Sequence, residues 1–399
     1  MPRLPLPRGV VTLGLVSLFM DTSSELIHSL LPVFLVTVLG TSTIMLGFIE
    51  GVAEATAAIT RVFAGAISDW LGRRKPLVLL GYGIAALSKP LFPLAGGAGM
   101  VFTARLVDRL GKGIRGAPRD ALIADITPAG LRGAAYGLRQ SMDTVGAFAG
   151  PALALLLMAI TGDDFRQVFW VAVLPAIIAV IIIIVWVKEP ETTPHEQVRR
   201  LPLTKAAMLR LPRRYWWVLA FALVLTLARF SEAFLLLRAE QVGLAIGQVP
   251  LIMIVMNLCY AASAYPFGRW GDTVPRRRLL GLGIAFLIAA DVTLALAGNP
   301  LMVAAGAVLW GLHMGATQGL LVAIVADAAP ADLRGTAFGL FHLSQGLALL
   351  AASVIAGGLW AWLGAAGTFY AGSVFAAIAL LGLSLAAVNG TRKRGRDKP

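Results

Sequence analysis

The chain has 399 residues, of which 58% are hydrophobic and only 14% are charged, and its mean hydropathy is +0.80. A soluble domain carries about 25% charged residues, so this composition excludes an ordinary soluble protein and indicates that much of the surface faces lipid. The formal net charge of +13 lies in short segments between apolar runs, so we expect it to orient the chain in a bilayer rather than to bind nucleic acid. The single cysteine, Cys259, excludes an internal disulfide and a cysteine-based metal site.

Twelve apolar stretches are long enough to cross a bilayer, because one helical crossing takes about 20 residues. In chain order they cover residues 9–38, 43–69, 76–95, 98–119, 132–160, 165–187, 215–240, 247–270, 277–296, 299–327, 333–361 and 366–388. Runs such as Val171–Val187 are apolar on every side, which excludes the alternating strands of a membrane β-barrel. The fold class is therefore expected to be an all-α membrane protein.

Arginine and lysine separate onto one side of the expected membrane. They gather at both termini and in the segments near 73–75, 199–214 and 276–278, whereas the opposite loops hold almost none apart from Arg166. Because basic loops stay on the cytoplasmic side, we expect both termini to be cytoplasmic. The localisation that we expect is a bacterial inner membrane, crossed many times.

Two motifs return about 200 residues later in the chain, which indicates an internal duplication. DITPAGLRGAAYG at Asp125 returns as DAAPADLRGTAFG at Asp327, and GAISDWLGRRK at Gly65 returns as GRWGDTVPRRR at Gly268. Tandem halves in one orientation place a substrate site between them, near the middle of the bilayer. The expected organisation is an N-terminal six-helix bundle at 1–187, a cytoplasmic linker at 188–214, a C-terminal bundle at 215–390 and a basic tail at 391–399.

The segment Gly65-x-x-x-Asp69-x-x-Gly72-Arg73-Arg74-Lys75 resembles the loop 2–3 signature of the major facilitator superfamily, and the weaker copy at Asp272 is also typical of that family. The resemblance covers essentially the whole chain. It implies two six-helix bundles around a central cavity, related by a pseudo-two-fold axis, and secondary transport by alternating access rather than enzyme activity. The gating residues expected in these loops are Gly65, Asp69, Arg73, Arg74, Arg132, Asp272 and Arg334.

The fifth expected helix carries Gly146-Ala-Phe-Ala-Gly150-Pro151, which resembles the glycine-rich signature of the drug:proton antiporters in this superfamily. The closing glycine pair of that signature is absent near Ala154. Small residues at this spacing let helices pack closely, and a proline kinks the helix, so Gly146, Gly150 and Pro151 join the expected gating residues. The resemblance implies proton-coupled export.

The fourth expected helix carries a stripe of charges at three- and four-residue spacing, and the first, second and fifth expected helices carry acidic residues that can pair with it. Charges at this depth must face protein or a water-filled cavity, and we expect a connected network of ion pairs. The proton-coupling candidates are Asp21, Glu25, Glu54, Asp108 and Asp143. The substrate-binding candidates are His28, Glu50, Arg105, Arg109, Lys112, Arg229, Glu232, Asn257, His313, Gln318, His342 and Gln345. For the membrane histidines, a helix-to-helix hydrogen bond is the alternative.

The function expected from these residues is proton-coupled export of a small organic compound by a monomer, and the excess of arginine and lysine favours an anionic or zwitterionic substrate. Asp21, Glu25 and His28 share a helix face and have the chemistry of metal ligands, but the basic stripe opposes a bare cation. No resident metal and no other cofactor are expected. Import of a metabolite, export of a metal or metal chelate, and a membrane sensor that does not transport remain alternatives.

Overall fold

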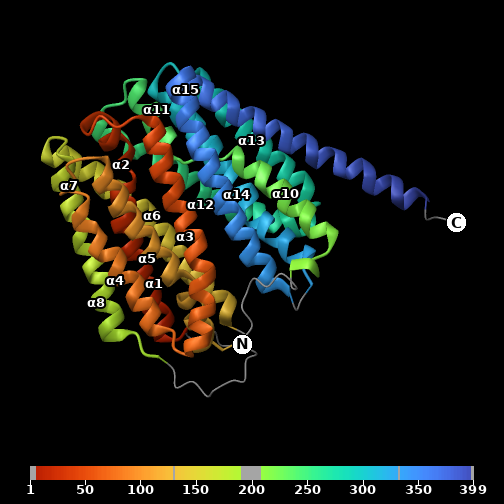
Figure 1. Ribbon diagram of the computed structural model, residues 1–399, viewed down its shortest axis with the longest axis horizontal. Coiled ribbons are helices and arrows are strands. Elements are labelled where there is room, and N and C mark those ends of the chain that lie inside the picture. The colour runs from red at the N-terminus through yellow and green to blue at the C-terminus, as the bar shows by residue number, and fades with distance from the viewer. Residues whose placement is uncertain (1–5, 129–130, 190–207, 331–332, 397–399) are drawn as a thin grey trace.

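The computed structural model describes residues 6–128, 131–189, 208–330 and 333–396, and in these residues the fold is entirely helical (Figure 1). The side chains of three predicted gating residues, Asp69, Asp272 and Arg334, lie outside the described part. Most of the predicted linker, 190–207, lies outside it as well.

The N-terminal group of helices contains six membrane crossings. Their elements are α1 (Arg8–His28), α2 (Leu31–Val33), η1 (Phe34–Val38), α3 (Thr43–Leu71), α4 (Lys75–Ser88), η2 (Lys89–Leu91), α5 (Ala98–Ile126), α6 (Arg132–Thr161), α7 (Phe165–Val171) and α8 (Val173–Trp186). Local signals set several ends. The Ser42 hydroxyl accepts a hydrogen bond from the Met45 amide at the start of α3, and Gly72 ends that helix with φ 65°, a conformation that glycine adopts at little cost.

The C-terminal group also contains six crossings. Its elements are α10 (Arg213–Leu227), α11 (Ala233–Gln241), η4 (Ile246–Gln248), α12 (Pro250–Thr273), α13 (Arg276–Leu296), α14 (Pro300–Ala328) and α15 (Arg334–Arg396). The long α15 is two crossings joined at Gly364, whose φ of 75° and ψ of 179° interrupt the helix. The twelve predicted crossings are therefore confirmed as helices in the described residues.

Two crossings differ from the predicted spans in ways that concern the site. Helix α5 continues past the predicted end at residue 119 to Ile126, because the polar turn at its end is held by ion pairs of Asp120. The seventh crossing is broken between α10 and α11. Within the described residues, eight helical stretches are long and apolar enough to cross a membrane when judged by length and composition alone. The crossings that miss these criteria are the short α4, the charged α5 and the broken α10–α11.

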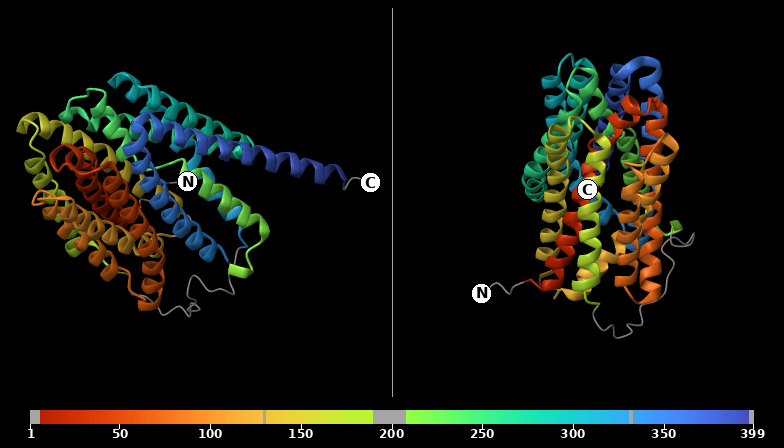
Figure 2. Two further views of the ribbon diagram at one scale, coloured as in Figure 1. Left: turned by 45° about the horizontal axis from the view of Figure 1, so that its top comes forward. Right: turned by 90° about the vertical axis from the view of Figure 1, so that its left-hand side faces the viewer.

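The two groups of helices meet mainly along α3 with α15 and α6 with α12. Near the start of α3 the contact is tight, since the Thr43 hydroxyl donates to the Gly357 carbonyl at 3.1 Å and a Cβ on Gly51 would lie 2.9 Å from the Leu350 Cα. Figures 1 and 2 show the groups close together near α2 and α11 and parting towards the end that carries the N-terminus. The main apolar core joins both groups at the closed end, through residues such as Phe34 and Phe234.

Candidate functional site

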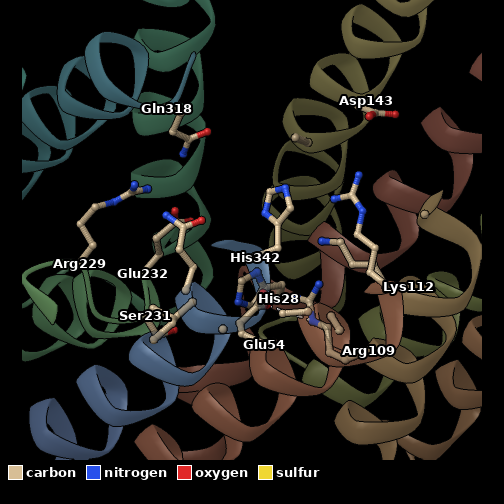
Figure 3. Close-up of a pocket in the computed structure, with 18 of the residues that line it drawn as sticks. His28, Glu54, Arg109, Lys112, Asp143, Arg229, Ser231, Glu232, Gln318 and His342 are labelled. Carbon is tan, nitrogen blue, oxygen red and sulfur yellow. Dashed lines mark ion pairs between the residues drawn. The ribbon is translucent and has the colours of Figure 1, made fainter. Parts of the chain in front are cut away.

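A cavity of about 730 Å³ lies between the two groups of helices, within the size range of small-molecule sites. Its walls come from α1, α3, α5 and α6 on one side and from the α10–α11 break, α12, α14 and α15 on the other (Figure 3). Most of the predicted site residues line it. They are Asp21, Glu25, His28, Glu50, Glu54, Arg109, Lys112, Asp143, Arg229, Glu232, Asn257, Gln318, His342 and Gln345.

Glu50 of α3 is the centre of one polar cluster in the wall. Arg105 of α5 donates to both its oxygens, from Nε at 3.1 Å and from Nη2 at 2.8 Å, and both side chains are almost fully buried. The His28 ring lies 3.4 Å from Glu50 and 3.4 Å from Glu25. Ser231 on the α10–α11 break donates to Glu50 at 3.5 Å, so this cluster connects the two groups of helices.

A second set of ion pairs follows the same wall. Arg109 lies 3.2 Å from Glu54, and Arg139 donates to Asp143 at 2.7 Å. Asp21 of α1 is close enough to Asp143 of α6 for the two carboxylates to interact. The predicted network of ion pairs therefore exists.

Asp120 joins the cations at the open end of the cavity, and the sequence prediction missed it. Its carboxylate lies 3.3 Å from Arg61, 3.2 Å from Arg119 and 3.8 Å from Arg139. Because the predicted helix ended at 119, Asp120 was expected in a loop. Sequence spacing gives no signal of its role, since its contacts with Arg61, Arg119 and Arg139 come from three different helices.

Three predicted residues do not line the cavity. Asp108 points away from it and accepts a hydrogen bond at 2.7 Å from Lys89, which also donates to Ser24. Arg105 is buried, and its Nε and Nη2 both donate to Glu50. His313 is fully buried and its Nδ1 lies 2.8 Å from the Gly283 carbonyl of α13, which is the helix-to-helix bond that the sequence left open.

The seventh crossing enters the cavity as a non-helical segment, residues 228–232. It presents Arg229, Ser231 and Glu232 towards the cavity (Figure 3). Across the cavity, Lys112 of α5 is exposed to its interior. Within the described residues, Lys112, Arg229 and Glu232 have no ion-pair partner within 4 Å, in contrast to the paired charges of the N-terminal wall. Glu232 is within electrostatic range of four charged groups: His28, Glu25, Arg229 and Glu54.

The glycines predicted on the fifth crossing bring α6 against α1 at the cavity acids. A Cβ on Gly146 would lie 3.0 Å from the Asp21 Cβ, and one on Gly150 would lie 2.8 Å from the Glu25 Cβ. Gly150 and Pro151 are buried within a helix that continues through the proline.

Arg74, which was predicted for gating, forms an ion pair in the N-terminal group, and the C-terminal copy of the loop forms a similar pair. Arg74 lies 3.4 Å from Asp125, and in the C-terminal group Arg276, which aligns with Arg73 in the repeat, lies 2.5 Å from Asp327. Gly65 packs against α5, since its Cβ would lie 3.3 Å from Ala117. Arg73 and Arg132 are exposed.

Comparisons with known proteins agree with this architecture. The sequence profile of the Major Facilitator Superfamily matches residues 13–237 and 230–399. The chain belongs to the major facilitator superfamily. It is thus a multi-pass membrane protein and a secondary transporter, and not an enzyme. An uncharacterized MFS-type transporter of Methanocaldococcus jannaschii is 31% identical over 384 residues, which are 94% of this chain and 93% of that protein.

Other similar proteins support the fold of this transporter. The multidrug resistance protein MdtH of Proteus mirabilis is 29% identical over 145 residues, 36% of this chain and 35% of that protein. A crystallised POT family transporter has a TM-score of 0.82 at 12% identity and covers 97% of this chain and 96% of its own. The nucleoside transporter NupG has a TM-score of 0.78 at 11% identity and covers 94% and 99%. At these identities the two structures show the major facilitator fold alone.

The described side chains were also compared with the arrangement that a metal site requires. No cluster of three or more His, Cys, Asp or Glu side chains suited to a metal ion occurs in the described part of the chain. Glu25 and His28 do lie together, but His28 is already placed between Glu25 and Glu50.

Proposed function

We propose that this transporter exports a small organic zwitterion in exchange for protons. The observation that carries the proposal is the set of three charged groups without an ion-pair partner in the described cavity wall, Lys112, Arg229 and Glu232. Two cations facing each other across a cavity suit an acid group, since buried charges need a partner. A carboxylate beside them suits an amine.

Exchange with protons follows from competition at the carboxylates. A substrate amine and a proton cannot both neutralise Glu232, so loading of one promotes release of the other. Asp21 and Asp143 are the further proton acceptors in the proposal, because two neighbouring carboxylates repel each other when both are ionised. Glu25 and Glu54 lie in the same wall and complete the proton-coupling set.

Export is the direction that the α1–α6 contact supports. Gly146 and Gly150, which resemble part of an exporter signature, touch α1 beside Asp21 and Glu25. The partial similarity to the drug exporter MdtH agrees with this direction. We further propose that the open end of the cavity faces the cytoplasm, because the exposed Arg73 and Arg132 lie at that end.

Flux into inverted proteoliposomes under an imposed pH gradient tests the proposal. The panel contains amino acids and other zwitterions, simple carboxylates, organic cations and divalent metal ions. We expect zwitterion flux opposite to proton flux. Flux of carboxylates in the same direction as protons would instead indicate a symporter that imports, and binding without any flux would indicate a sensor.

A further inference from the structure

Asp291 of α13 is a buried carboxyl group outside the cavity. Its side chain is fully buried, and neither oxygen has a hydrogen-bond partner among the residues that the structure describes. Leu287 and Leu294, four residues before and three after it, are also fully buried and share its helix face. A carboxylate in such surroundings is very costly to ionise, so Asp291 holds a proton in this conformation.

Phe230 lies close to Asp291 and also reaches the cavity. A Cβ on Gly372 of α15 would lie 2.7 Å from the Asp291 Oδ2 and 3.0 Å from the Phe230 ring, so the ring and the carboxyl group meet at the same glycine. Phe230 also lines the cavity. Its ring packs against Trp310 at 5.7 Å and Phe369 at 5.5 Å. A cluster of aromatic rings thus packs around Phe230, the cavity residue that lies close to the acid.

Charged and titratable groups on the neighbouring elements do not reach Asp291. They are Arg229 and Glu232 of the α10–α11 break, Arg238 of α11, whose Nε donates to the Leu294 carbonyl of α13 at 3.0 Å, His313 of α14, His342 and Tyr370 of α15, and Tyr260 of α12. Within the described residues, none of them donates a hydrogen bond to the carboxyl group or forms an ion pair with it. On α13 itself, Arg276, Arg277 and Arg278 lie at the first turn, about 20 Å away along the axis. A change in charge at Asp291 therefore requires a change in its surroundings.

The surroundings contain an element that is suited to move. Phe230 sits within residues 228–232, where the seventh crossing is not helical, so a regular ladder of helical hydrogen bonds does not fix it. The same segment contacts the other group of helices through Ser231 and Glu50. Rocking of one group against the other thus acts on the segment that covers Asp291.

We infer that Asp291 is a second proton-binding site of the transport cycle. It holds its proton while Phe230 covers it, and it gives the proton to water in the cavity when the halves change position and the ring moves aside. The carboxyl O–H bond breaks, the water takes the proton, and the carboxylate faces the cavity. The inference rests on alternating access and not on the substrate proposed above.

The pH dependence of the equilibrium between the two conformations, measured without substrate, tests this site. Spin labels are placed at Ala134 and Thr273, exposed at the open ends of α6 and α12, in a Cys259→Ser background in lipid nanodiscs. The ratio of short to long distances is followed against pH, and its logarithmic slope gives the protons linked to the change. Asp291→Asn and Asp291→Leu are compared with Asp164→Asn, which removes an acid that does not line the cavity but keeps a capping residue.

The expected result is a slope that is smaller by up to about one proton in both Asp291 variants and unchanged in Asp164→Asn. A slope unchanged in all variants overturns the inference. Failure of both neutral variants to fold also overturns it, because the folded protein would then require an ionised Asp291. If the wild type transports no zwitterion but the Asp291 variants still show the smaller slope, the result counts against the proposed substrate and not against this inference.

Discussion

Lys112 and Arg229 differ from the other cavity cations in having no ion-pair partner within the described residues. Arg109 and Arg139 are paired with Glu54 and Asp143, so their charges are already balanced by a neighbouring carboxylate. An incoming acid group gains most from cations whose charge is not yet compensated. Substrate recognition in our account therefore depends on unpaired charges rather than on the total charge of the wall.

The Lys89–Asp108 pair is predicted to stabilise the fold and not to carry the coupled proton. Lys89→Met leaves Asp108 buried beside an apolar side chain and should lower the unfolding free energy by about 3–5 kcal/mol, seen as a lower Tm. Lys89→Met/Asp108→Leu should recover most of this loss and keep proton-coupled flux. A double variant that folds but has lost coupling would return Asp108 to the proton path.

Sequence reasoning found most cavity residues, because polar side chains at mid-membrane depth must face protein or water. It failed where it had to decide which face of a helix lines the cavity. Asp108 and Arg109 are adjacent in the chain, yet one meets Lys89 and the other meets Glu54. Lys89 and Asp291 were missed, since each is a single polar residue in an apolar run whose surroundings only the tertiary structure shows.

Among the elements, α1 and α6 pack most closely at the cavity acids, because glycines face α1. A Cβ on Gly150 would lie 2.7 Å from the Leu26 backbone nitrogen and 2.8 Å from the Thr22 carbonyl oxygen. Backbone atoms of a helix cannot rotate away as a side chain can. The distance between the two helices, and with it the positions of Asp21 and Glu25, thus depends on the absence of a side chain there.

Gly150→Ala is predicted to push α6 away from α1. Overpacking of this kind costs about 1–3 kcal/mol, and we expect a lower Tm together with reduced flux. Gly137→Ala on the same helix is the matched control, since its Cβ would meet nothing within 4 Å. It should raise stability by up to about 1 kcal/mol, from helix propensity. Equal effects of the two substitutions would contradict the close contact.

The break between α10 and α11 was not predicted, because residues 228–232 contain neither glycine nor proline. Tertiary contacts stabilise it instead. The Ser231 amide donates to the Ser353 hydroxyl at 3.3 Å, and the Ala233 amide donates to the Ser231 hydroxyl at 3.3 Å. Such contacts cannot be predicted from composition or spacing. Only the tertiary structure shows that this segment brings Arg229, Phe230 and Glu232 to the cavity.

At the scale of the whole molecule, the fold was largely predictable. Repeated motifs at Gly65 and Gly268 indicated two related groups of helices, and each group has an Arg–Asp ion pair at this loop, Arg74–Asp125 and Arg276–Asp327, although the two arginines differ by one position in the repeat. Which end of the cavity is open was not predictable. That property depends on the contact between α3 and α15, where Thr43 meets Gly357, and one sequence must support both the open and the closed arrangement.

Binding of a transported zwitterion to charge variants tests the central claim most directly. The account predicts that Lys112→Gln and Arg229→Gln each weaken binding by more than tenfold, since removing a charge from a buried charged contact costs about 2–5 kcal/mol. It also predicts that Arg214→Gln, which removes an exposed cation at the start of α10, leaves the Kd unchanged. Wild-type affinity in both cavity variants, measured by calorimetry on folded protein, would contradict the account.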